Sequence, residues 1–306
     1  MSSKTYSLAL NRGRLSSPSI CKNVVEQRFG YDGVGNCTAV YITISMKNQL
    51  NERFTMRDYF SSKFDEYVKV QIGLLNKANI RYCDDIEQLS KNQKYIGKNS
   101  FKLMQPLALK PFAEIIYKHL IKEVKPNQEG KYLMFTLVTG FNFGKDNWNN
   151  NYHKLQEITK KLLSGYDYLA TVALDEFPRE RYINDGILMS WHVHGIIFDK
   201  PSRWSIKKIN DKVKRKGHKI TPFKTSSYER LIDAIYYAFK GPFGGKVKIT
   251  DKNGNISFRR VKLSLFSYYQ NLMRLKNYPI YFGMFAGGKG EKVLDDILEE
   301  ISNDKA

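Results

Sequence analysis

Three segments of strand character, at residues 131–139, 166–177 and 191–198, limit the folds open to this chain. They are rich in β-branched and aromatic residues, and an amphipathic helix at residues 150–163 separates the first from the second. Only the short loop 178–186 leads from the second towards the third, and strands joined in this way are antiparallel neighbours. The sequence therefore predicts a domain built on an antiparallel pair of strands.

The remaining patterns divide the chain into three expected parts. Residues 38–46 alternate as a strand does, and residues 60–78 and 110–124 carry apolar residues at helical spacing. Pro, Asn and Gly cluster at residues 125–130, which is typical of a connection between domains. We expect an N-terminal α/β extension at 1–125, a central domain at 126–265 and a C-terminal helical segment at 266–306.

The composition indicates a polyanionic partner in a reducing compartment. The formal net charge is +20, the pI is about 9.6, and 13% of the residues are aromatic, with rings able to stack on bases. The three cysteines show no CxxC spacing, so neither a disulfide framework nor a structural zinc site is indicated. No apolar run approaches the roughly 20 residues of a membrane-spanning helix. We therefore expect a cytoplasmic protein with no membrane partner.

Most of the excess positive charge lies in residues 200–262. This segment contains 18 Lys or Arg against four Asp or Glu, so it carries +14 of the net charge. Runs of charge usually form a solvated face, but this one repels itself unless a polyanion such as a nucleic-acid backbone neutralises it. The residues expected to bind DNA are Lys207, Lys208, Lys212, Lys214, Arg215, Lys216 and Arg230.

Two of the five histidines, His192 and His194, could form a metal site. Alternate strand residues point to the same face, so their imidazoles can chelate one divalent metal; two hydrogen-bonded core histidines are the alternative. Asp175 and Glu176 end the neighbouring strand, and only one of them can face the histidines; we favour Glu176. His119 lies on the apolar stripe of a predicted helix, where a hydrogen-bonded core or interface histidine is expected.

A helix predicted over residues 226–240 carries a candidate nucleophile. The adjacent side chains of Tyr236 and Tyr237 diverge by about 100°, so only one of them can point at a given centre. Lys240 lies beside both on the helix surface. A tyrosine assisted by a cation and a nearby metal can attack a phosphodiester. Since the spacing Tyr-x-x-Lys is common by chance in this chain, the order of the motifs has to carry the argument.

The segments FTLVT at 135–139, HVH at 192–194 and YAFK at 237–240 resemble, in this order, motifs I, II and III of the HUH endonuclease superfamily. The resemblance covers residues 131–240 and is to the single-tyrosine rolling-circle replication initiators, the Rep proteins. It implies the HUH/Rep nuclease fold, an α+β fold in which an antiparallel β-sheet is flanked by helices. The HUH nuclease domain would correspond to residues 126–265.

The resemblance also implies a metal site and a covalent intermediate. His192 and His194 would bind Mg²⁺ or Mn²⁺, with Glu176 as the third, acidic ligand. Tyr237 would attack a DNA phosphate and leave a 5′-phosphotyrosyl link beside a free 3′-OH. Lys240 would orient the metal site or the phosphate.

The resemblance implies partners as well. A Rep protein nicks single-stranded origin DNA of a plasmid or virus and works with a host DNA polymerase. Asp233 resembles the acidic residue with which some Reps activate water. No G-x-x-x-x-G-K-[ST] motif occurs, so a host helicase would separate the strands. Two alternatives stay open: a single-tyrosine transposase of the same superfamily, and a non-catalytic basic protein that binds nucleic acid. Nothing in the sequence indicates an oligomeric state.

Overall fold

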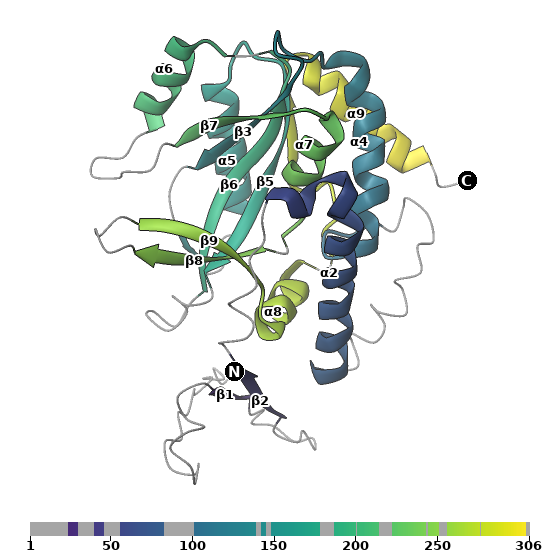
Figure 1. Ribbon diagram of the computed structural model, residues 1–306, viewed down its shortest axis with the longest axis vertical. Helices are drawn as coiled ribbons and strands as arrows, with labels where there is room; N and C mark the ends of the chain where they lie inside the picture. Colours follow the sequence, from purple (N-terminus) through teal and green to yellow (C-terminus); the bar gives the residue numbers. More distant parts are fainter. Residues whose placement is uncertain are drawn as a thin grey trace, which may run out of the picture. The chain divides into compact units, whose positions relative to one another are not determined.

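The computed structural model divides into two units, residues 1–53 and 54–306 (Figure 1). In the first unit, β1 (Val24–Phe29) pairs antiparallel with β2 (Val40–Ser45), which confirms the strand predicted at 38–46. The described residues are 24–29, 40–45, 56–82, 101–138, 142–144, 148–177, 187–199, 201–213, 222–242, 244–250, 256–275 and 277–303.

The second unit contains the remaining helices and strands of the described residues. Its helices are η1 (Met56–Tyr59), α2 (Ser61–Tyr82), η3 (Pro106–Ala108), α4 (Leu109–Glu123), α5 (Trp148–Leu162), α6 (Arg203–Val213), α7 (Leu231–Ala238), α8 (Leu265–Leu275) and α9 (Lys289–Asn303). Its strands are β3 (Tyr132–Val138), β4 (Asn142–Gly144), β5 (Tyr168–Phe177), β6 (Ile187–Ile197), β7 (Phe223–Tyr228), β8 (Gly244–Thr250), β9 (Ile256–Lys262) and β10 (Met284–Gly287). The helix predicted from residue 226 is wrong at its start, because residues 226–228 belong to β7.

The chain is an α+β protein, but its main sheet is mixed where an antiparallel sheet was expected. The strand order is β7-β3-β6-β5-β8-β9, with β10 also paired to β5 and β4 to β6. Between the strands that the structure describes, every pairing in this sheet is antiparallel except a short parallel contact of Asp175 and Glu176 in β5 with Gly244 and Gly245 in β8. Strand β10 pairs with the first half of β5, at residues 168–171. The backbone groups at the C-terminal end of β5 need another partner, and β8 supplies it.

Helices cover both faces of this sheet. On one face, Trp191 and Val193 of β6 pack with side chains of α5 and α6, such as Tyr152 and Ile209. On the other face, Ile196 of β6 joins a larger cluster with residues of α2, α4, α7, α8 and α9. Because alternate strand residues face opposite ways, both histidines of β6 lie on the same side as Ile196, which is the α7 side. Figure 1 shows α7 lying over this side of β5 and β6.

The larger cluster joins regions that the sequence assigned to different parts of the chain. Buried residues of α2 and α4, including Phe64 and Ile116, pack with Ala234 of α7 and Ile297 of α9. Burying one such large apolar side chain contributes about 1.5–3 kcal/mol. The division between the two units at residues 53 and 54 therefore does not coincide with the boundary expected at 125–130.

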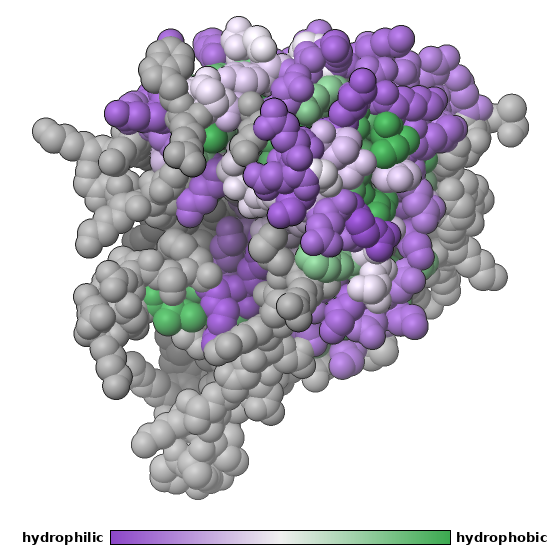
Figure 2. Space-filling view, turned by 45° about the horizontal axis from the view of Figure 1, so that its top comes forward, coloured by the Kyte–Doolittle hydropathy of each residue, from purple (hydrophilic) through white to green (hydrophobic). Residues whose placement is uncertain are grey.

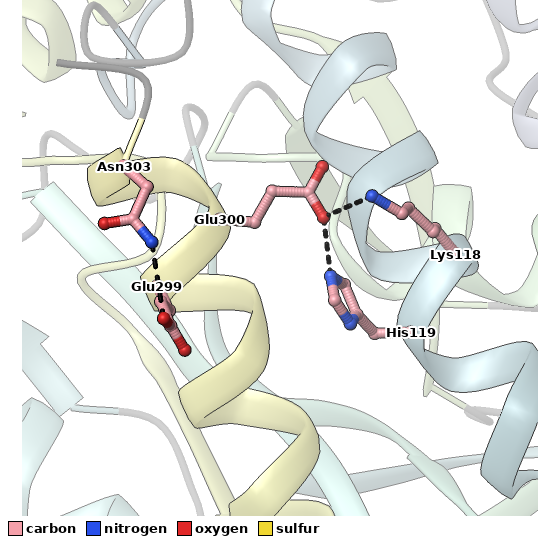
Figure 3. Close-up of polar contacts among 5 residues, drawn as sticks. All are labelled: Lys118, His119, Glu299, Glu300 and Asn303. Carbon is pink, nitrogen blue, oxygen red and sulfur yellow. Dashed lines mark hydrogen bonds and ion pairs between the residues drawn. The ribbon is translucent and has the colours of Figure 1, made fainter. Parts of the chain in front are cut away.

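Helix α9 is tied to α4 by polar contacts at its C-terminal end (Figure 3). Glu300 Oε2 lies 2.8 Å from Lys118 Nζ and 2.7 Å from His119 Nε2. On the adjacent turn, Asn303 donates to Glu299 Oε1 at 3.3 Å. The expectation that His119 is a hydrogen-bonded interface histidine is therefore confirmed.

On the face shown in Figure 2, the described residues are mostly hydrophilic, with smaller hydrophobic areas between them. Among the helices in the described parts of the chain, none has the length and apolar content needed to cross a membrane.

Candidate active site

The two histidines of β6 meet on the α7 side of the sheet. His192 and His194 are 1% and 2% exposed, and their Nε2 atoms are 3.0 Å apart. Thr136, which pairs with His194 across the β3–β6 ladder, places Oγ1 2.9 Å from His194 Nδ1. A partner on Nδ1 fixes the orientation of the ring and leaves Nε2 directed at the centre of the site.

Asp175 brings a carboxylate to the same centre. Its Oδ2 lies 3.3 Å from His192 Nε2, and the residue is 1% exposed. A Cβ at Gly244 would lie 2.9 Å from Asp175 Oδ1, so a glycine at this position leaves room for the carboxylate. The sequence favoured Glu176 as the acidic ligand, whereas the carboxylate that the structure shows beside His192 is that of Asp175. The side chain of Glu176 lies outside the described residues.

Two lysines surround the carboxylate with positive charge. Lys246 of β8 places Nζ 2.7 Å from Asp175 Oδ2. Lys240, just after α7, is 3% exposed, and its Nζ has no hydrogen-bond partner among the described residues. Burial lowers the pKa of Lys240 to about 8, although the charge of Asp175 acts in the opposite direction. The sequence pointed to Lys240 but not to Lys246.

These charges also set the protonation of the acid and of one histidine. Burial acts to raise the pKa of Asp175, but Lys246 and the neighbouring basic side chains outweigh it and lower that pKa below the usual range. Burial, and then the nearby ammonium of Lys240, lower the pKa of His194 well below its usual value. At neutral pH the site therefore presents an ionised carboxylate and a neutral imidazole at His194, which are the forms that bind metals.

The adjacent tyrosines of α7 point in different directions. The ring centroid of Tyr237 is 5.1 Å from that of His194, with the planes at 71°. The ring of Tyr236 instead stacks on Phe64 of α2, with centroids 3.9 Å apart and planes at 9°. Lys240 Nζ is 4.8 Å from the ring centroid of Tyr237. The structure therefore brings Tyr237, and not Tyr236, to the histidines.

Two further residues around Tyr237 were not found from the sequence. The guanidinium of Arg260, on β9, donates through Nη2 to Tyr237 Oη, and its Cζ is 4.5 Å from the centroid of that ring. Tyr59 of η1 packs edge-on against Tyr237, with centroids 5.4 Å apart. Neither residue belongs to a recognisable motif, and the only sequence signal for Arg260 was its place in the basic segment 200–262.

Asp233 has a structural contact. Its Oδ1 accepts a hydrogen bond of 2.7 Å from the backbone N–H of Ser61, the first residue of α2. The first backbone N–H groups of a helix have no acceptor within the helix, and a side-chain acceptor at this end satisfies one of them. Asp233 therefore joins α7 to the start of α2, and Arg230 Nε lies 4.0 Å from its Oδ2.

The expected DNA-binding residues do not gather around the histidines as a group. Helix α6 carries Lys207, Lys208 and Lys212 as exposed side chains, while its Ile209 packs with Phe223 on the sheet face opposite the histidines. Arg230 is exposed beside α7. Lys214, Arg215 and Lys216 lie outside the described residues.

The donor atoms suit a divalent metal in spacing, but they do not form a closed site. Ligand atoms about 2.1 Å from one metal and at right angles are themselves about 3 Å apart, and His192 Nε2 has neighbours at 3.0 and 3.3 Å. Among the described side chains, however, no group of three or more His, Cys, Asp or Glu residues is arranged to hold a metal ion. Lys246 engages the same oxygen of Asp175 that lies near His192. Metal binding therefore stays a prediction.

No protein-family model matches this chain, and no curated protein or solved structure is significantly similar to it.

Proposed function

We propose that this protein is a metal-dependent endonuclease and strand transferase of the HUH type, which nicks and rejoins single-stranded origin DNA to initiate rolling-circle replication of a plasmid or virus. The observation that carries the proposal is the position of Tyr237, whose ring lies against His194 beside two cations, Lys240 and Arg260. A nucleophilic tyrosine, a pair of histidines and basic side chains are the parts that a covalent attack on a phosphodiester needs.

In the proposed reaction, Tyr237 Oη forms a bond to the phosphorus of the scissile phosphate and the P–O3′ bond breaks. The phenolic proton passes to water, and the departing O3′ takes a proton from water. The products are a 5′-phosphotyrosyl link and a free 3′-OH. Attack by a 3′-OH on the same link reverses the step and rejoins the strand, so no external energy source is needed.

His192, His194 and Asp175 would hold the divalent cation, Mg²⁺ or Mn²⁺. Bound there, the cation would polarise the scissile phosphate and offset its developing charge. The donor set supports this role, because His194 is held neutral and Asp175 ionised. Glu176 remains the alternative acid that the resemblance implies. Lys240 would bind a phosphate oxygen through Nζ, which has no hydrogen-bond partner in the described part of the chain.

The basic surface supports a nucleic-acid substrate. The chain carries a net charge of +20, and the exposed lysines of α6 add to the charge available for backbone contacts. Strand separation and extension of the 3′-OH would require a host helicase and a host DNA polymerase. A single-tyrosine transposase would use the same residues on transposon ends, and mapping the nicked sequence separates the two.

The decisive experiment is a search for the covalent adduct. The protein is incubated with single-stranded DNA covering candidate origin sequences, with Mn²⁺ or with EDTA, and the products are separated on a denaturing gel. We expect an adduct that requires metal, is lost in Tyr237→Phe and persists in Tyr236→Phe. Asp175→Asn is expected to weaken Mn²⁺ binding, measured by calorimetry, more than Glu176→Gln does.

Loss of the adduct in Tyr236→Phe alone would keep the chemistry and move the nucleophile. Tight binding of several origin-bearing DNAs without any cutting or joining would instead favour a non-catalytic binding protein. The contact of His194 with Thr136 would then be structural.

A further inference from the structure

The β8–β9 hairpin delivers two cations to the candidate site. Lys246 and Arg260 are paired directly across the hairpin. Like charges in such a pair destabilise a sheet unless each has a counter-group. Here both side chains find partners in the site: Lys246 pairs with the carboxylate of Asp175, while Arg260 donates to the Tyr237 hydroxyl and lies over its ring. The hairpin is therefore part of the site and not only a basic surface strand pair.

Arg260 has one nitrogen on the nucleophile and another without a partner. Its Nη2 donates to Tyr237 Oη, while the buried Nη1 has no hydrogen-bond partner among the described residues. The guanidinium also lies over the rings of Tyr59 and Tyr237, with its Cζ 5.5 and 4.5 Å from their centroids. A buried cationic donor without an acceptor costs free energy, which an incoming anion would recover.

A second unpaired donor flanks the same ring. Lys240 Nζ is buried, has no hydrogen-bond partner among the described residues, and is 4.8 Å from the ring centroid of Tyr237. The nucleophile thus lies between two cations, each with one buried nitrogen, Arg260 Nη1 or Lys240 Nζ, that has no acceptor among the described residues. A phosphodiester, with two anionic oxygens beside the phosphorus to be attacked, is an anion of the right form for two such donors.

We propose that Arg260 is a catalytic residue that bridges the nucleophile and the scissile phosphate, holding Tyr237 Oη with Nη2 and a non-bridging phosphate oxygen with Nη1. This inference rests on the proposed nuclease function. Arg260 exchanges no proton in the reaction. It stabilises the negative charge that the phenol oxygen gains on losing its proton, and then the charge that develops on the phosphoryl oxygens.

The test compares Arg260→Gln with Arg259→Gln on the adjacent position of β9. Both changes remove one positive charge, but adjacent strand residues point to opposite faces. In single-turnover adduct formation with Mn²⁺, we expect Arg260→Gln to slow the reaction by about 10²-fold or more, as loss of a transition-state donor does elsewhere. Arg259→Gln should stay within about threefold of the wild-type rate, since it leaves every donor of the site in place.

Two further readouts separate catalysis from binding and folding. In a Tyr237→Phe background, both glutamine variants should bind single-stranded DNA with similar affinity, because each loses one charge. Arg260→Lys keeps the positive charge but has one nitrogen where arginine has two to reach the phenol and the phosphate, so it should react about tenfold more slowly than wild type. If Arg260→Gln fails to fold, the rate of Arg260→Lys tests the proposal.

The outcomes are distinguishable. Equal rates for wild type, Arg260→Lys and a folded Arg260→Gln would overturn the role of Arg260 and leave the nuclease intact. Absence of any adduct in the wild type, with every origin DNA and metal tried, would overturn both proposals. A rate loss matched by an equal loss of DNA affinity would also overturn the inference, because Arg260 would then serve binding alone.

Discussion

At the scale of single residues, Lys240 carries the clearest energetic signature. Its ammonium is buried and lacks a hydrogen-bond partner among the described residues, so burial lowers its pKa from 10.5 to about 8. A buried charge without full compensation destabilises the folded state. Lys240 also lies beside Tyr237, the candidate nucleophile. Functional sites are where proteins retain buried charges that destabilise the folded state.

We expect Lys240→Met to stabilise the protein at pH 7 by on the order of 2–3 kcal/mol. The folded pKa lies below the unfolded value, so between about pH 8 and 10.5 the unfolded chain binds more protons. Wild-type stability therefore rises with pH in this window relative to the variant, and the advantage of the variant shrinks until it vanishes near pH 10.5. Urea denaturation at pH 7, 8, 9 and 10 measures this change.

The matched control is Lys207→Met, which removes an exposed lysine of α6 and should change stability little at any pH. A variant at Lys240 that is less stable than the wild type at pH 7, or whose advantage stays constant up to pH 10, would contradict the account of a buried, uncompensated ammonium.

The residues of the site differ in how far the sequence could predict them. His192, His194 and Tyr237 follow from local spacing, because alternation within a strand and rotation within a helix are fixed by backbone geometry. The choice between Asp175 and Glu176 depends on the register between β5 and β6, in which Ala173 pairs with His192. A one-residue slip would bring the other carboxylate to the histidines, and one sequence does not determine that register.

At the scale of the elements, the packing of β6 against β3 and β5 depends on Gly195. A Cβ there would lie 2.5 Å from Cε1 of Phe135 and 2.7 Å from the carbonyl oxygen of Leu169. Phe135 is fully buried and the carbonyl belongs to the backbone of the neighbouring strand, so neither can move freely. Close packing between the strands therefore favours glycine at position 195, in addition to any role of this residue in a motif.

We expect Gly195→Ala to destabilise the protein by about 1–3 kcal/mol, because the added methyl group overpacks a filled interior. Gly73→Ala is the opposing control: no atom lies within 4 Å of a Cβ at Gly73, and alanine in a helix is favoured over glycine by about 1 kcal/mol. Urea unfolding of both variants measures the difference. Equal stabilities would show that β3 and β5 shift to accept the methyl group.

Element by element, local patterns predicted more than long-range pairings. Helices α2, α4 and α5 and strands β3, β5 and β6 follow from periodicity, but Ser226 to Tyr228 carry too little apolar pattern to reveal the edge strand β7. The hairpin β8–β9 lies in the basic segment 200–262, but its contact with the site was not predicted. That contact arises from the parallel pairing of β8 with the end of β5, which joins residues far apart in the chain.

At the scale of the whole molecule, the candidate site belongs to one of the two units. Its residues come from Tyr59 to Arg260, and both buried clusters draw on residues 59–301. Residues 1–53 carry seven Lys or Arg and three Asp or Glu, which is +4 of the net +20. Most of the charge that would attract a nucleic acid therefore also lies in residues 54–306.

We expect a shortened chain of residues 54–306 to unfold in one cooperative transition and to keep most of the DNA affinity. Each phosphate contact adds about 0.7 to the slope of log affinity against log salt for a single strand, so losing four net positive charges should reduce that slope by at most about 3. Binding to single-stranded DNA across a salt series, with the full chain alongside, measures this.

If the proposed nuclease is correct, the shortened chain should also form the covalent adduct at a rate within about threefold of the full chain, because every described group around Tyr237 is retained. A stable shortened chain that binds DNA normally but forms no adduct would assign residues 1–53 a direct part in presenting the scissile phosphate.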